Sequence, residues 1–342
     1  MQNSRIGRTG QRELHVHGVH VIRVLIAASM IATDSILELS AANRTRTRFA
    51  ARIGGTTLGV TSGHVNLSIV PDSELNAFLI PDQRCDVECT ARFVNAVSEF
   101  EGELVFDSGG LWKLYRNAAG YCFRFATSFL GDTPYKQAIV SPDFTKVRID
   151  LVQRFYDPSK PWNPLEYPLD ELLWIHRLSM KQGVEMHGCG VITPDGRGFL
   201  LTGHSGAGKS TSARMWARNA AARVLSDDRI ILRAEGDRIW MYGTPWHGDA
   251  GIAEADRFPL DGIFVLEHGA ENRMQPLNPT KASAELFARS FVPHHSVEGL
   301  NFVLEFFDQL TSLVPCFSFP FVPNATAVEA LLASSTGKIA AA

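Results

Sequence analysis

The stretch GFLLTGHSGAGKST, residues 198–211, is the part of the chain from which the rest can be interpreted. It begins with an apolar run typical of a buried strand, continues into a glycine-rich turn, and ends at residues that suit the start of a helix. Gly203, Gly208, Lys209 and Ser210 fit the spacing G-x-x-x-x-G-K-[ST]. In a strand–turn–helix context, this spacing predicts a loop that holds phosphate groups.

The physical basis of this pattern is specific. Glycines let successive backbone N–H groups turn inward around an anion, and the helix that follows directs its positive end at the same anion. Lys209 is expected to contact phosphate oxygens, and the Ser210 hydroxyl is expected to bind Mg²⁺. The alternative is a glycine-rich helix start that binds no ligand. The residues that we expect around the phosphates are Gly203, His204, Ser205, Gly206, Ala207, Gly208, Lys209, Ser210 and Thr211.

Length and composition limit the possible classes of protein. The 342 residues are enough for two domains, and 45% hydrophobic and 20% charged residues are typical of a globular protein. A net charge of -3 argues against a nucleic-acid binder that depends on overall positive charge. Five scattered cysteines favour a reduced, cytoplasmic setting. Cys85 and Cys89 lack a second pair that would complete a zinc site, so we expect ordinary thiols there.

Residues 1–45 form an uncertain N-terminal extension, which we expect to be poorly ordered. A basic start and an apolar patch over residues 19–32 are features of a signal peptide. Arg23 interrupts the patch, however, and no clear cleavage site follows it. The patch is also too short and too charged to predict a membrane-spanning helix.

Residues 46–156 predict a β-rich domain of antiparallel strands. Residues 48–53 and 56–60 flank Gly54 and Gly55, as in a hairpin. No group of residues in this domain has a pattern that indicates chemistry. The further predicted strands are residues 65–70, 76–80, 86–94, 103–106, 111–115, 121–125, 137–140 and 146–151.

A proline-rich linker over residues 157–164 separates this domain from a second domain, residues 165–335. The second domain alternates strand and helix patterns, which predicts an α/β core with a mixed sheet. We expect helices over residues 165–182 (capped by Gly183), 209–221, 281–290, 297–310 and 325–333. We expect strands over residues 184–187, 190–193, 198–202, 224–225, 230–234, 238–242 and 262–267.

Asp227 and Asp228 follow a short apolar strand that comes one helix after the phosphate loop. We expect that strand to lie beside the strand that leads into the loop, with both carboxylates facing the phosphates. Phosphoryl transfer needs one carboxylate for Mg²⁺ and one to accept the proton of the attacking group. Adjacent residues of a regular strand point to opposite faces, so a bend is required here. The alternative is a pair of turn or helix-capping aspartates.

Other candidate residues surround this pattern. His187 could orient a catalytic carboxylate, or it could be structural. Thr244, Trp246 and His247 could form a loop that covers the site or binds an acceptor, or the loop could simply be rigid. Further candidates, each of which could equally be structural, are the charge stabilisers Arg229, Arg257 and Arg289.

From about residue 184 onward, the order of His187-Gly188, the phosphate loop and Ser226-Asp227-Asp228 resembles the bacterial HPr kinase/phosphorylase family, in particular the HPr-kinase-like serine kinases. The resemblance implies the fold shared with phosphoenolpyruvate carboxykinase, the use of ATP and Mg²⁺, and transfer to a serine hydroxyl. It also implies phosphate and Mg²⁺ contacts for Lys209 and Ser210. Asp227 and Asp228 would be the base and the metal-linked carboxylate, with His187 as their partner.

The residues therefore predict an ATP-dependent kinase that phosphorylates a hydroxyl, such as a serine of a peptide, a protein or a small molecule. Its expected partners are ATP, Mg²⁺ and that acceptor, without nucleic acid or a membrane span, and with a possible homo-oligomer. One alternative is a nucleotide-binding regulatory module without transfer activity. Another is a carboxykinase-like or nucleotide-hydrolysing enzyme.

Overall fold

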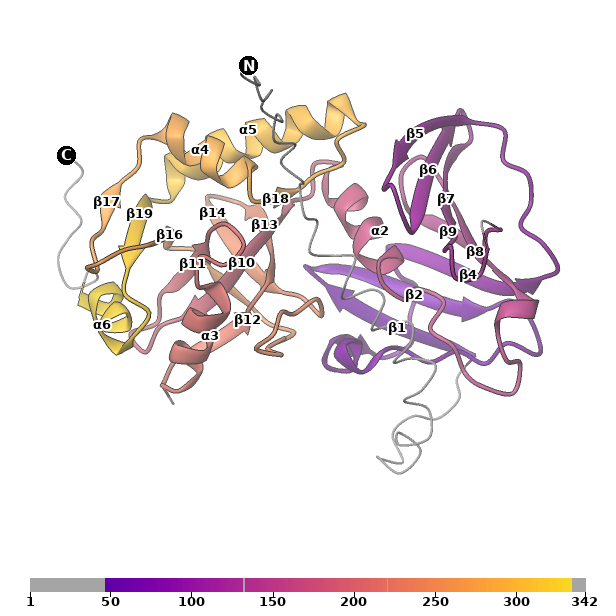
Figure 1. The fold of residues 1–342 in the computed structure, drawn as a ribbon, viewed down its shortest axis with the longest axis horizontal. Coiled ribbons are helices and arrows are strands. Elements are labelled where there is room, and N and C mark those ends of the chain that lie inside the picture. Colours follow the sequence, from indigo (N-terminus) through magenta and orange to yellow (C-terminus); the bar gives the residue numbers. More distant parts are fainter. Residues whose placement is uncertain (1–46, 132, 220, 334–342) are drawn as a thin grey trace, which may run out of the picture. The chain divides into compact units, whose positions relative to one another are not determined.

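The structure is a computed structural model that describes residues 47–131, 133–219 and 221–333 (Figure 1). The predicted N-terminal extension, residues 1–45, lies outside the described residues, and the domain limits at 156 and 165 stay predictions. Among the described residues, no helix has the length and apolar character needed to cross a membrane.

The first of two large sheets is built from the residues that precede the proline-rich linker. Its strand order is β3-β1-β2-β4-β9-β8-β7-β6-β5, and a 3-10 helix, η2 (Ser73–Phe78), precedes β3. A second 3-10 helix, η3 (Gln153–Phe155), follows β9. The strands are β1 (Arg48–Ile53), β2 (Thr56–Ser62), β3 (Leu79–Ile80), β4 (Val87–Val94), β5 (Glu103–Asp107), β6 (Trp112–Asn117), β7 (Gly120–Phe125), β8 (Lys136–Val140) and β9 (Lys146–Val152).

The β-rich character and the hairpin of β1 and β2 are confirmed, but three expectations for this sheet are wrong. The sheet is mixed rather than antiparallel, because β4 pairs in parallel with both β2 and β9. Residues 65–70 make only an isolated bridge, between Ile69 and Trp162. Most of the segment predicted as a strand at 76–80 is the end of η2, because a short apolar run such as Ala77 to Ile80 does not by itself distinguish a strand from a helical turn.

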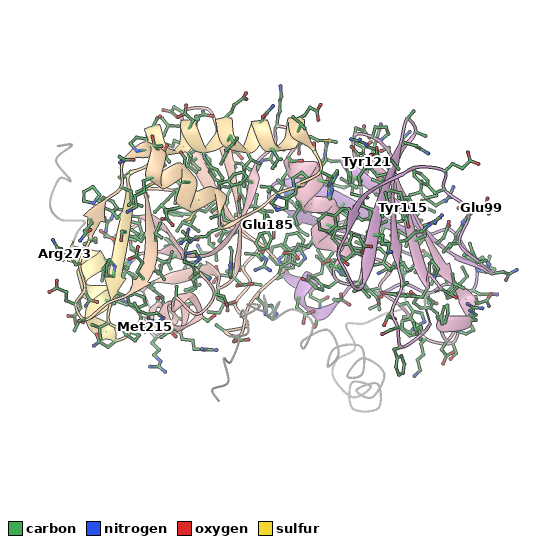
Figure 2. All side chains as sticks on the ribbon, turned by 45° about the horizontal axis from the view of Figure 1, so that its top comes forward. Glu99, Tyr115, Tyr121, Glu185, Met215 and Arg273 are labelled. Carbon is green, nitrogen blue, oxygen red and sulfur yellow. The ribbon has the colours of Figure 1, made fainter. Side chains whose placement is uncertain are left out.

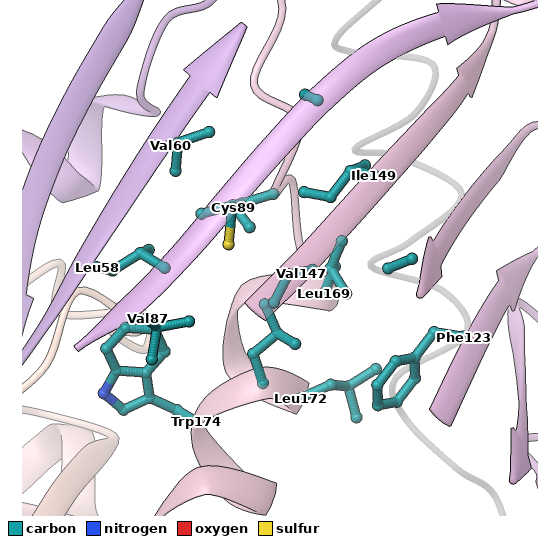
Figure 3. Close-up of a cluster of buried hydrophobic side chains, with 14 of the residues drawn as sticks. Leu58, Val60, Val87, Cys89, Phe123, Val147, Ile149, Leu169, Leu172 and Trp174 are labelled. Atoms are coloured by element: carbon teal, nitrogen blue, oxygen red, sulfur yellow. The ribbon is translucent and has the colours of Figure 1, made fainter. Parts of the chain in front are cut away.

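Helix α2 (Leu169–Leu178) packs its apolar side against this sheet. Figure 3 shows Leu169 and Leu172 facing Val147 and Phe123 of the sheet. The Trp174 indole Nε1–H donates to the Ile53 carbonyl over 3.1 Å. The helix is shorter than predicted and ends before Gly183. The left-handed residue after it is Lys181, at φ 61°.

The second sheet contains the phosphate-loop stretch. Its order is β15-β14-β13-β10-β11-β16-β19-β17, and β12 and β18 also pair with β10. Helices α3 (Lys209–Ala217), α4 (Pro279–Phe287), α5 (Val297–Leu313) and α6 (Ala325–Ala333) accompany it. The strands are β10 (Val184–Ile192), β11 (Gly198–Thr202), β12 (Arg223–Ser226), β13 (Arg229–Glu235), β14 (Arg238–Gly243), β15 (Arg257–Pro259), β16 (Gly262–His268), β17 (Gln275–Pro276), β18 (Ser290–Phe291) and β19 (Cys316–Phe321).

Helices cover both faces of the second sheet (Figure 1). Because side chains alternate along a strand, Leu200 packs with α4 and α5, while Phe199 and Leu201 pack with α3 and α6. This double cover explains the continuous apolar run of β11, all of which is buried. The predicted α/β core with a mixed sheet is confirmed: β11, β16 and β19 are parallel, and β10 is antiparallel to β11.

The placement of β12 differs from the sequence prediction. This strand pairs with β10, and β10 in turn pairs with β11. Asp227 and Asp228 therefore follow a strand that is one position removed from the phosphate-loop strand. The two strands predicted at 184–187 and 190–193 are one long strand, β10, with an irregularity between Gly190 and Val191.

Candidate active site

The predicted phosphate loop lies between β11 and α3, at the end of a fully buried strand. Gly206 and Gly208 have φ values of 81° and 102°, a region that side chains with a Cβ rarely adopt. A Cβ on Gly208 would also lie 2.7 Å from the Phe321 ring. Both glycines are therefore required by the backbone, and they shape the turn that the sequence pattern predicted.

Helix α3 begins without a side-chain cap, so its first amide groups remain available to an anion. Lys209, the first residue of the helix, is 6% exposed. Its Nζ donates to the carbonyls of Gly203 and His204, over 3.0 and 3.1 Å. Burial lowers the pKa of Lys209. An uncapped helix start, two left-handed glycines and a lysine held across the turn fit a phosphate ligand.

Strand β10 brings His187 and Asp228 to the start of this loop. Gly188 lies opposite Thr202, the last residue of β11. The Thr202 hydroxyl donates to the His187 carbonyl over 2.7 Å, and the Gly188 N–H donates to the Asp228 carbonyl over 3.0 Å. His187 and Asp228, which are far from Thr202 in the sequence, are thus held beside it at the start of the loop.

The Asp228 carboxylate is held by two basic side chains. Its Oδ1 lies 3.0 Å from His187 Nε2, and its Oδ2 pairs with Arg229 Nη1. Burial raises the pKa of Asp228, but the hydrogen bond from His187 and the charges of Arg229 and Lys209 outweigh it, so the pKa is lowered overall. The side chain keeps 23% of its surface exposed. Asp228 is therefore an ionised carboxylate that a solute can reach.

Asp227 has a different environment from its neighbour. It is fully buried, and its carboxylate accepts hydrogen bonds from the N–H groups of Gly248, Ala250 and Ile252, over 3.0, 2.9 and 3.2 Å. The predicted bend is present, and the Ser226 hydroxyl accepts from the N–H groups of both Asp228 and Arg229. The bend points the two carboxylates into different surroundings, and only Asp228 combines solvent access with basic partners.

A buried acidic cluster lies behind Arg229. Arg229 Nε lies 2.7 Å from Glu171 Oε1 and 3.6 Å from Glu185 Oε1. Glu185 is fully buried in the interior (Figure 2), and burial, together with the charge of Glu171, raises its pKa well above the usual range. Burial also raises the pKa of Asp170 to about 7. These three acids were not among the predicted site residues, although a glutamate between Val184 and Met186 in an apolar strand was a usable signal.

The loop predicted to contact the acceptor is mostly buried. The Thr244 hydroxyl donates to the Arg229 carbonyl over 2.8 Å. Trp246 is 9% exposed, and its Nε1–H donates to Asp170 Oδ2 over 2.7 Å. His247 is exposed. Thr244 and Trp246 therefore tie the loop to β13 and α2, and only His247 has a side chain open to a solute.

The other arginine candidates are placed differently. Arg289 pairs with Glu285, and its carbonyl accepts from the His187 N–H over 2.8 Å. Arg257 pairs with Glu235, which lies at the far end of β13 from Asp228. Of the three arginines, only Arg229 contacts a predicted catalytic side chain.

The described residues contain no group of three or more His, Cys, Asp or Glu side chains arranged to hold a metal ion. A Mg²⁺ ion at a phosphate loop needs only one or two protein ligands, because phosphate oxygens and water supply the rest. Ser210, in the first turn of α3, and the accessible Asp228 carboxylate have suitable donor atoms for this. Asp227 is fully buried, so its carboxylate oxygens are not exposed to a metal ion at the loop.

No family model and no curated protein matches the chain. Among solved structures, the chain is similar to the Hpr(Ser) kinase/phosphatase from Coxiella burnetii. That likeness has a TM-score of 0.26 and 16% sequence identity, and it covers 45% of this chain and 99% of that one. A likeness at this level assigns no role to any residue, so the roles proposed below rest on the contacts within this chain.

Proposed function

We propose that the chain is an ATP-dependent kinase that transfers the γ-phosphate to a hydroxyl group, such as a serine of a peptide, a protein or a small molecule. The observation that carries this proposal is the position of an accessible, ionised carboxylate, Asp228, beside the start of a phosphate loop. A phosphate cradle alone suits any nucleotide binder. A carboxylate that is paired with basic side chains and lies next to the cradle can accept the proton of an acceptor hydroxyl.

In this proposal the N–H groups of the loop and of the first turn of α3 hold the phosphates, and Lys209 offsets their charge. The hydroxyl oxygen of the acceptor forms a bond to the γ-phosphorus, and Asp228 accepts the proton of that hydroxyl. The bond between the γ-phosphorus and the β,γ-bridging oxygen breaks, and ADP leaves. His187 holds the carboxylate toward the loop. Asp227 acts indirectly, because it fixes residues 248–252 next to Asp228.

When bound, Mg²⁺ would neutralise charge on the phosphates, with Ser210 as the candidate ligand and phosphate oxygens and water completing its shell. The chain's other contributions need no metal. The uncapped helix supplies donors, and the packing of β10 against β11 sets the distance between base and loop. The phosphoenolpyruvate carboxykinase-like fold and the cytoplasmic location remain part of this proposal. All five cysteines are free and buried, as a reducing compartment allows.

The test compares Lys209→Ala with the parent chain and with Lys146→Ala, which changes an exposed lysine at the start of β9. Transfer from γ-labelled ATP is measured in a cell extract, and the labelled species is identified by mass spectrometry. We expect Lys209→Ala to lower transfer by about 10²–10³-fold, with an unchanged circular dichroism spectrum. Equal transfer by Lys209→Ala and the parent chain would contradict the assignment of the loop.

The same assay separates the alternatives. Binding of ATP in calorimetry without any labelled product would indicate a regulatory module. Release of inorganic phosphate at a rate that acceptors do not change would indicate a nucleotide hydrolase. Turnover of oxaloacetate would indicate a carboxykinase. Each of these outcomes would contradict the kinase proposal.

A further inference from the structure

One guanidinium connects the Asp228 carboxylate to an acidic side chain that lies outside the second sheet. Arg229 Nη1 pairs with Asp228 Oδ2, and Arg229 Nε lies 2.7 Å from Glu171 Oε1. The two contacts use different nitrogen atoms of one rigid planar group, so the position of one end of that group fixes the other end. The direction of the Asp228 carboxylate therefore depends on where Glu171 holds Arg229.

The surroundings of Arg229 leave its guanidinium little room to turn. Its side chain is 16% exposed, and its guanidinium carbon lies 4.2 Å from the centre of the Phe291 ring. The centre of that ring lies 6.2 Å from the centre of the His187 ring. A ring face beside the guanidinium restrains it in one direction, and in its own plane its charged partners restrain it. Those partners are Glu171, Glu185 and Asp228.

Glu171 is itself fixed by packing. It is 5% exposed and lies in the first turn of α2. Leu169 and Leu172 of the same helix pack into the core of the first sheet, and the Trp174 indole donates to a backbone carbonyl of β1 (Figure 3). A side chain is positioned most precisely when it belongs to a rigid helix or strand. Helix α2 therefore gives Glu171 a fixed place from which to hold Arg229.

A second acid, Glu185, lies behind this contact. Its Oε1 lies 3.6 Å from the same Arg229 Nε, which is beyond hydrogen-bond distance. Because burial and the charge of Glu171 raise the pKa of Glu185 well above the usual range, Glu185 is neutral at neutral pH. If Glu171 lost its charge, Glu185 would ionise more readily and would pair with Arg229 instead. A test of Glu171 must therefore account for Glu185.

We infer that Glu171 is a positioning residue for Asp228, which it orients by holding the guanidinium of Arg229. This inference rests on the proposed function, in which Asp228 accepts the proton of the acceptor hydroxyl. Proton transfer requires a carboxylate oxygen within hydrogen-bond reach of that hydroxyl and in the right direction. Loss of the Glu171 contact lets Arg229 and Asp228 turn, which lowers the rate of transfer. Lys209 keeps its own contacts across the phosphate loop, so ATP binding is retained.

The first test uses the double variant Glu171→Gln, Glu185→Gln, in which amides of the same shape replace both acids. We expect its rate of transfer from γ-labelled ATP, at saturating ATP, to fall by about 10–100-fold, with the KM for ATP within about twofold of the parent chain. The matched control is Glu88→Gln, which removes the same charge from a glutamate that pairs with Arg48 at 2.9 Å in the first sheet. A rate for the double variant equal to that of the control would overturn the inference.

The second test separates positioning from a general structural effect, and it also serves if the double variant fails to fold. Glu171→Gln alone keeps Glu185 as a partner for Arg229. It should lower transfer at least about threefold in the parent chain and leave the residual transfer of Asp228→Asn unchanged, because an amide cannot act as the base. An equal fold-loss in both backgrounds would show that Glu171 acts through the fold as a whole, and would overturn the inference.

A third measurement needs no turnover. Rotation of the Arg229 guanidinium about its Nε–Cζ bond, followed by NMR of its nitrogen atoms, should be faster in Glu171→Gln than in the parent chain and in Glu88→Gln. Equal rotation in all three chains would overturn the inference. Absence of transfer by the parent chain would contradict the proposed function instead, and the rotation would still report whether Glu171 holds Arg229. Transfer by the parent chain at the same rate as by both Glu171 variants would remove this inference alone.

Discussion

His187 Nε2 lies 3.0 Å from Asp228 Oδ1, and the backbone of Gly188 is bonded to the carbonyl of Asp228. The pair is therefore held by two independent contacts, one between side chains and one between main chains. Because Gly188 is also opposite Thr202, the pair is anchored to the strand that leads into the predicted phosphate loop. This relationship makes Asp228, and not Asp227, the carboxylate that we assign to proton transfer.

Asp228→Asn should lower transfer by about 10²–10⁴-fold while ATP binding, measured by calorimetry, is retained.

In the parent chain the pKa of Asp228 is lowered, so the carboxylate is lost only when the pH falls well into the acid range. His187→Asn removes one of the groups that lower this pKa, so the acid limb of kcat/KM against pH should move to higher pH. An acid limb at the same pH in His187→Asn would exclude Asp228 as the titrating group.

The sequence predicted the local patterns well and the pairing between them less well. The strand–turn–helix unit of β11 and α3, the bend at residues 227–228 and the hairpin of β13 and β14 follow from short-range spacing of glycines and apolar residues, and all are present. The neighbour of β12 was predicted wrongly, because no local signal reveals that the long strand β10 pairs with β11, β12 and β13. Which aspartate is accessible depends on the remote loop 248–252, which an adjacent Asp pair does not indicate.

Asp227→Ala should destabilise the fold. It removes the acceptor for three N–H groups of residues 248–252, and an unpaired buried donor costs on the order of 1–3 kcal/mol. Because the loop can admit water, we expect a loss of about 2 kcal/mol in the free energy of unfolding. Denaturant titration measures it, and hydrogen exchange at Gly248, Ala250 and Ile252 should accelerate. Asp249→Ala, an exposed change in the same loop, is the control. Equal stability of the two variants would show that the carboxylate does not hold the loop.

Arg229→Met should lower the free energy of unfolding more than Asp227→Ala or Asp228→Asn does. Its guanidinium is the cation next to Glu171, Glu185 and Asp228, and removing one partner of a buried ion pair costs about 3–5 kcal/mol. Adding Glu171→Gln to Arg229→Met should recover part of this loss, because the neutral amide leaves less buried charge unpaired. Arg238→Met, at an exposed position of β14, should stay within about 0.5 kcal/mol of the parent chain. A double variant no more stable than Arg229→Met would argue that packing, and not charge, explains the loss.

His176 should make the fold sensitive to acid. Its ring is 5% exposed and stacks on Phe144 with centroids 4.9 Å apart, and Nδ1–H donates to the Leu172 carbonyl over 2.7 Å. Nε2 is buried without a partner among the described residues, and the His295 ring lies 5.0 Å away. Burial lowers the pKa of His176 to about 3 and that of His295 to about 4. Both rings are thus neutral in the fold at neutral pH.

The sign of the effect follows from these lowered pKa values. The unfolded chain binds protons as the pH falls below about 6.5, where the folded rings remain neutral, so each ring reduces stability by up to about 1.4 kcal/mol per pH unit. The loss of stability continues down to about pH 3 for His176.

His176→Phe keeps an aromatic ring beside Phe144 but cannot titrate. Its free energy of unfolding, measured by denaturant titration at several pH values, should fall less steeply between pH about 6 and 4.5 than that of the parent chain. The control His268→Phe changes an exposed ring and should keep the parent slope. If His176→Phe kept that slope as well, this ring would not be the source of acid sensitivity.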